Sequence, residues 1–124
     1  MSRMLKLALS IHMIVGVILG VFLFVIPGRF LAWLGWAPVD PIISRVLGAA
    51  LMAMSWGDLR VWRRGTKAEA RLWVEVQLGF AALASIGVLR HLLVGSWPVM
   101  VWAVFGAFGL FALIWLGVLV REPR

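Results

Sequence analysis

The sequence predicts an all-α integral membrane protein: a bundle of four transmembrane helices with a short interfacial helix after the first span. Apolar residues make up 64% of the 124 residues and charged residues only 14%, whereas a soluble domain carries roughly 25% charged residues. The apolar residues form four runs long enough to cross a bilayer, and most basic residues fall in short segments between these runs. A chain of this length supplies one transmembrane domain, residues 1–124, and no separate soluble domain.

The first predicted span covers residues 5–26, where only Lys6 and His12 interrupt an apolar run. At about 1.5 Å per residue, this run covers the ~30 Å hydrocarbon core of a bilayer. The pattern from Arg29 to Trp36 indicates a short amphipathic helix that lies along the membrane surface. The other three spans are predicted over residues 41–62, 71–94 and 99–120.

The basic residues predict the orientation. Nine of them lie on one side of the predicted spans: Arg3, Lys6, Arg60, Arg63, Arg64, Lys67, Arg71, Arg121 and Arg124. Three lie on the other: Arg29, Arg45 and Arg90. Because short cytoplasmic loops carry the excess of Lys and Arg, we expect a plasma (inner) membrane protein with both termini in the cytoplasm. The net charge of +7 then faces anionic lipid headgroups, and nucleic acid is not an expected partner.

Small residues mark the predicted contacts between helices, since backbones in lipid associate where small side chains let them approach closely. The first span carries Ala8, His12, Gly16 and Gly20 at spacings of four. Corresponding stripes run through Ser44, Gly48, Ser55 and Asp58, through Glu75, Gly79, Ala82 and Ile86, and through Gly106, Gly109, Leu113 and Gly117. The predicted packing residues are therefore Gly16, Gly20, Gly48, Gly79, Gly106 and Gly109.

Three ionisable residues, His12, Asp58 and Glu75, lie on these stripes near the predicted cytoplasmic end. At about 1.5 Å per residue, His12, Glu75 and Asp58 lie roughly 9, 6 and 3 Å below the flanking basic residues, so they could meet in one polar pocket in the inner leaflet. An ionisable residue inside a span is by default a candidate functional site. Arg45 and Arg90 lie near the outer face, where Asp40 or a lipid phosphate is the expected partner.

Two pairings of Glu75 compete. Arg71 lies one turn before it, at the spacing of a salt bridge within one helix. His12 is the other candidate partner, and a His12–Glu75 pair could exchange a proton. His12 could also remain neutral and donate a hydrogen bond to a neighbouring carbonyl or carboxylate.

The sequence offers little for catalysis or cofactors. Cysteine is absent, and His12 and His91 fall on opposite sides of the predicted membrane, too far apart to share a metal or a haem. No serine, histidine and carboxylate share a depth in a way that indicates a nucleophile. We therefore expect no enzyme activity, no bound metal and no cofactor.

The second span opens with Pro41-Ile-Ile-Ser-Arg45-Val-Leu-Gly48-Ala-Ala, an arginine followed by a glycine three residues later. This opening resembles that of the small four-helix bacterial membrane proteins of the DoxX-like kind. The resemblance implies a four-helix membrane protein that works as a partner of redox enzymes, and it assigns no catalytic residue.

We therefore predict a non-enzymatic structural or accessory component of a membrane complex, either self-associating or docked on a larger assembly. One alternative is a small proton-linked carrier or channel that uses Glu75 and His12. Another is a helical bundle that binds a quinone or a lipid, near His12 or near Arg45 and Arg90.

Overall fold

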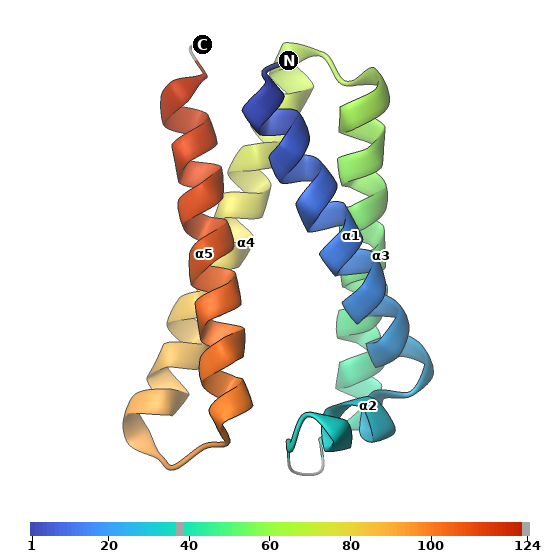
Figure 1. Cartoon of the computed structure of the whole chain (residues 1–124), viewed down its shortest axis with the longest axis vertical. Coiled ribbons are helices and arrows are strands. Elements are labelled where there is room, and N and C mark those ends of the chain that lie inside the picture. Colours follow the sequence, from blue (N-terminus) through green and yellow to red (C-terminus); the bar gives the residue numbers. More distant parts are fainter. Residues whose placement is uncertain (37–38, 123–124) are drawn as a thin grey trace. The chain divides into compact units, whose positions relative to one another are not determined.

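The computed structural model describes residues 1–36 and 39–122 (Figure 1). Over this range it has five helices and no strand: α1 (Arg3–Val25), α2 (Pro27–Trp33), α3 (Pro41–Arg64), α4 (Lys67–Val94) and α5 (Val99–Arg121). All but α2 are long and apolar enough to cross a membrane. The predicted all-α class with four candidate spans is confirmed. Arg124, one of the basic residues used for the orientation, lies outside the described residues.

The helix starts follow from local chemistry. Pro27 opens α2 two residues before the predicted position, because proline suits the first turn of a helix. Asp40 precedes α3, and its carboxylate accepts the backbone N–H groups of Ile42 and Ile43 at 2.8 and 3.1 Å.

Helix α4 begins at Lys67, four residues earlier than predicted. Thr66 accepts the backbone N–H of Glu69 at 3.2 Å, and the Glu69 carboxylate accepts the N–H of Thr66 at 2.7 Å. This reciprocal capping box satisfies the donors of the first turn, and it explains the earlier start.

The chain divides into two compact units. The α1/α3 unit covers Leu9–Arg64 and holds most of α1 together with α2 and α3. The α4/α5 unit consists of Met1–Ala8 and Gly65–Arg124, so that the first turns of α1 accompany α4 and α5.

In the α1/α3 unit the two long helices approach closely through glycines. A Cβ built on Gly48 would lie 2.7 Å from the carbonyl oxygen of Gly20 and 2.7 Å from the backbone nitrogen of Phe24. A Cβ on Gly20 would lie 2.9 Å from the carbonyl oxygen of Gly48. One turn further along, Gly16 meets the hydroxyl of Ser55. The backbones of α1 and α3 can come this close only because these positions have no side chain.

The α4/α5 unit packs through larger side chains, with α4 beside α5 (Figure 1). Trp115 of α5 is 0% exposed, and Val74 and Gln77 of α4 are each 1% exposed. Phe80 and Phe108 form an edge-to-face pair with ring centroids 5.7 Å apart. Large side chains and this edge-to-face contact, rather than contacts at glycines, hold α4 against α5.

We expect Gly48→Ala to destabilise the fold by about 1 to 3 kcal/mol, since the added methyl group meets backbone that can only move apart. Gly109→Ala is the matched control: a Cβ there meets no heavy atom within 4 Å, and alanine favours a helix by up to about 1 kcal/mol over glycine. Unfolding in detergent measures both. Equal stability of the two variants would contradict the close approach of α1 and α3.

Candidate functional site

The most buried ionisable group in the described residues is the carboxylate of Asp58 on α3, which is 0% exposed. Its Oδ2 lies 2.6 Å from Nδ1 of His12 on α1, whose side chain is 12% exposed. Both residues belong to the α1/α3 unit. A carboxylate held inside a candidate span is costly unless it is paired, and His12 supplies a partner for this one.

The glycine contacts position this pair. On α1, His12, Gly16 and Gly20 follow one another at spacings of four and therefore share a face. They meet, in antiparallel order, Asp58, Ser55 and Gly48 of α3. The Ser55 hydroxyl donates to the carbonyl oxygen of Leu51 at 2.9 Å, so it is satisfied within its own helix while it packs on Gly16.

The geometry defines the chemistry available to the pair. The donor and acceptor roles of Nδ1 and Oδ2 depend on the tautomer of the imidazole. An imidazole and a carboxylate at this distance share one hydrogen bond. Within the described residues no three His, Asp or Glu side chains gather as a metal site would require.

Glu75 has an ion-pair partner on its own helix. Its Oε1 lies 3.2 Å from Nε of Arg71, one turn earlier on α4. The Glu75 side chain is 49% exposed and that of Arg71 32%. A half-exposed pair at this spacing contributes a few tenths of a kcal/mol. Of the predicted three-residue pocket, the structure shows His12 with Asp58 and gives Glu75 the competing partner, Arg71.

Arg45 and Arg90 are both exposed. Asp40, their expected protein partner, instead caps α3 through its side chain. No ion pair joins either arginine to a described acidic residue, which leaves lipid phosphate as the expected partner. Arg45 and Arg90 belong to different units.

The predicted packing glycines fall into two groups. Gly16, Gly20 and Gly48 lie at the α1–α3 contact, whereas a Cβ at Gly79, Gly106 or Gly109 would meet no heavy atom within 4 Å. The buried residues of α4 are Ala70, Val74, Gln77, Ala81 and Leu92. At about 100° per residue they lie on the face opposite the stripe through Glu75 and Gly79. The packing role of Gly79, Gly106 and Gly109 stays a prediction.

Sequence reasoning placed His12 and Asp58 at a common depth but did not single out their pairing. The available signal was the register of the two small-residue stripes, since Gly16 and Gly20 opposite Ser55 and Gly48 bring position 12 to position 58. Comparisons with protein-family models, curated proteins and solved structures find no match. The DoxX-like resemblance therefore rests on residues 41–50.

We expect the losses in stability caused by His12→Leu and Asp58→Leu to be non-additive. Each single replacement leaves a polar partner in a low dielectric, and the double replacement removes both groups, so a coupling of about 0.5 to 1.5 kcal/mol should appear. A double-mutant cycle on unfolding in detergent measures it. His12→Leu combined with Asp40→Asn is the control and should be additive, because Asp40 lies in the same unit at the start of α3, far along that helix from Asp58. A zero coupling between positions 12 and 58 would contradict the pair.

Proposed function

We propose that this chain is a non-enzymatic, multi-pass protein of the plasma (inner) membrane that acts as a structural or accessory component of a membrane-protein assembly. The observation that supports the proposal is the outward position of small residues on α4 and α5. Gly79, Gly87, Gly106 and Gly109 all lie in helices, and none would meet another atom within 4 Å if it carried a Cβ.

A glycine in a helix interior costs up to about 1 kcal/mol relative to alanine. In lipid, that cost is offset where the absence of a side chain lets the backbone of another helix approach closely. The α1/α3 unit shows this use at Gly20 and Gly48. The α4/α5 unit presents the same kind of residue with no contact of its own, as a surface that a further transmembrane helix could approach.

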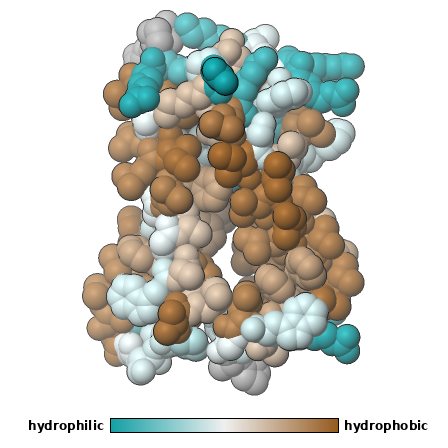
Figure 2. All heavy atoms as spheres, viewed as in Figure 1, coloured by the Kyte–Doolittle hydropathy of each residue, from teal (hydrophilic) through white to brown (hydrophobic). Residues whose placement is uncertain are grey.

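The remainder of the surface fits a membrane environment. On the face drawn in Figure 2, apolar side chains cover the middle of the helices and hydrophilic side chains gather at their ends. Large apolar residues of all four candidate spans are exposed, among them Ile18, Val46, Leu83 and Leu113. Lipid tails or partner helices would cover them.

A second candidate function has a specific observation in its favour. The buried His12–Asp58 pair, with Nδ1 2.6 Å from Oδ2, is that observation, because ionisable residues inside a membrane occur in proton relays. A small proton-linked carrier or channel would use this pair, with Glu75 as the other candidate partner of His12. A bundle that binds a quinone or a lipid, near His12 or near Arg45 and Arg90, is a separate alternative.

The first prediction from the proposed function is topological. A reporter fused after residue 124 should be active in the cytoplasm, and a reporter inserted before Pro41 should be active outside. The reason is the bias of nine basic residues against three. The opposite pair of reporter signals would reverse the orientation and leave four spans intact.

The second prediction concerns association. The double variant Gly106→Leu, Gly109→Leu should lose a partner membrane protein, or a second copy of the chain, in a pulldown in mild detergent. Its own unfolding should change by less than about 1 kcal/mol, because the leucines meet open space. Leu110→Ala, on an exposed position of the same helix, is the control. A lone chain that carries out pH-dependent uptake in vesicles, abolished by Asp58→Asn, would favour the proton-linked candidate instead.

A further inference from the structure

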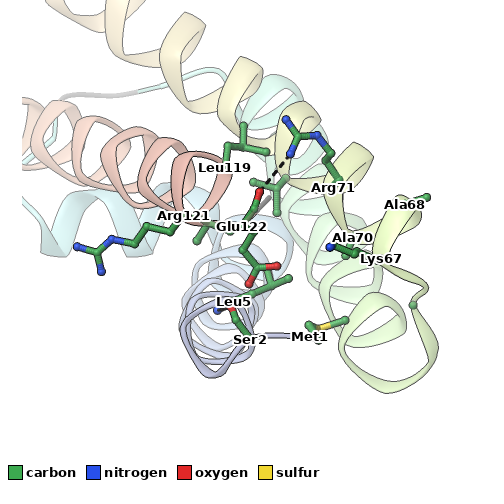
Figure 3. Close-up of a pocket in the computed structure, with 13 residues that line it drawn as sticks. Met1, Ser2, Leu5, Lys67, Ala68, Ala70, Arg71, Leu119, Arg121 and Glu122 are labelled. Carbon is green, nitrogen blue, oxygen red and sulfur yellow. Dashed lines mark hydrogen bonds between the residues drawn. The ribbon is translucent and has the colours of Figure 1, made fainter. Parts of the chain in front are cut away.

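A cavity of about 740 Å³ lies within the α4/α5 unit, between the first turns of α1, the start of α4 and the end of α5 (Figure 3). Its apolar walls include Leu5, Val74, Val118 and Leu119. Lys67 is the first residue of α4 and Arg121 the last of α5. When the two helices cross a bilayer, this cavity therefore lies at the depth of the lipid headgroups. Its volume falls in the usual range for a site that binds a small molecule.

Two cations line the cavity from α4. Lys67 and Arg71 are four residues apart and therefore share a face of that helix. Arg71 uses Nε on Glu75 at 3.2 Å and Nη1 on the backbone oxygen of Glu122 at 3.4 Å. A guanidinium has five N–H donors, so Arg71 keeps donors for a further acceptor. In Figure 3, Arg121 extends away from the other labelled side chains, which leaves Lys67 and Arg71 as the principal cations of the cavity.

One carboxylate lines the same cavity. Glu122 follows α5, where its backbone N–H donates to the carbonyl oxygen of Val118 at 2.9 Å. Its Oε1 is shielded from solvent and accepts no hydrogen bond from any described residue. A shielded carboxylate oxygen without a donor is costly, and a ligand that brings an N–H group would satisfy it.

We propose that this cavity binds the headgroup of a phospholipid that carries a primary ammonium, as phosphatidylethanolamine does. The phosphate lies on Lys67 and Arg71, the ammonium donates to Oε1 of Glu122, and the first acyl carbons lie along Leu5, Val74 and Val118. The cations of the cavity can take the phosphate of any phospholipid, so Glu122 makes the distinction: its Oε1 accepts an N–H from a primary ammonium, which an anionic headgroup such as that of phosphatidylglycerol lacks. The inference goes beyond the accessory role and requires only that α4 and α5 cross the bilayer.

The test is the binding of lipids of identical acyl chains to the purified full-length chain in mild detergent, followed by native mass spectrometry. Phosphatidylethanolamine should bind about tenfold more tightly than phosphatidylcholine, whose quaternary ammonium has no N–H to donate. Phosphatidylglycerol should bind no better than phosphatidylcholine. Soluble phosphoethanolamine, which lacks acyl chains, should not bind, and this arm separates a lipid site from a site for a free phosphate ester.

Variants test separately which residues bind the ammonium and which bind the phosphate of the headgroup. Glu122→Gln should remove the preference for phosphatidylethanolamine over phosphatidylcholine, whereas Lys67→Gln should weaken both lipids by the same factor of about three to ten. Asp40→Asn removes a carboxylate that does not line the cavity, and asparagine still caps α3, so this control should keep the preference. Equal binding of the two lipids to the unaltered chain, tighter binding of phosphatidylglycerol, or no bound lipid would each overturn the proposal. The pulldown that tests the accessory role is independent of all three outcomes.

Discussion

Helices in lipid gain little by burying apolar side chains against one another, so their association depends on how closely two backbones can approach. In the α1/α3 unit that approach occurs at Gly20 and Gly48, where neither position has room for a methyl group. The polar contacts of the unit depend on it. Wider separation of the helices would take Asp58 out of the 2.6 Å contact with His12 and leave a carboxylate with 0% exposure without its partner.

The α4/α5 unit solves the same problem differently. The Phe80–Phe108 edge-to-face pair joins α4 to α5, and Trp115 of α5 is fully buried. A Cβ at Gly79, Gly87, Gly106 or Gly109 would meet no heavy atom within 4 Å. The two units therefore differ in what they leave exposed. In the α1/α3 unit, Gly16, Gly20 and Gly48 lie at the contact between its own helices. In the α4/α5 unit, most helical glycines have no such contact, and one end of the unit holds a cavity lined by charged side chains. This difference is why association and lipid binding are both proposed for the α4/α5 unit.

The number and length of the helices could be predicted because apolar runs and their charged ends are local properties. The residues at the contact of α1 and α3 could also be predicted, because Gly16, Gly20 and Gly48 lie on small-residue stripes. On α4 the stripe through Gly79 and the buried stripe through Val74, Gln77 and Ala81 lie on opposite faces of one helix, and spacing alone does not choose between them. The sequence gives the depth of a residue along its helix. It does not give which helices are neighbours or how they are aligned, so the pairing of His12 with Asp58 could not be predicted from it. The early start of α4 was predictable from Thr66 and Glu69, since their spacing is that of a capping box.

The His12–Asp58 contact also bears on how the chain enters a bilayer during synthesis. Helix α3 is the least apolar of the four candidate spans, and a carboxylate such as Asp58 opposes its transfer into lipid. Helix α1 precedes it in the chain and carries both the imidazole that bonds the carboxylate and the glycines that fit its small-residue face. Because α1 is synthesised first, it is available to pair with α3, and α3 can partition into lipid as one half of a helical hairpin rather than alone.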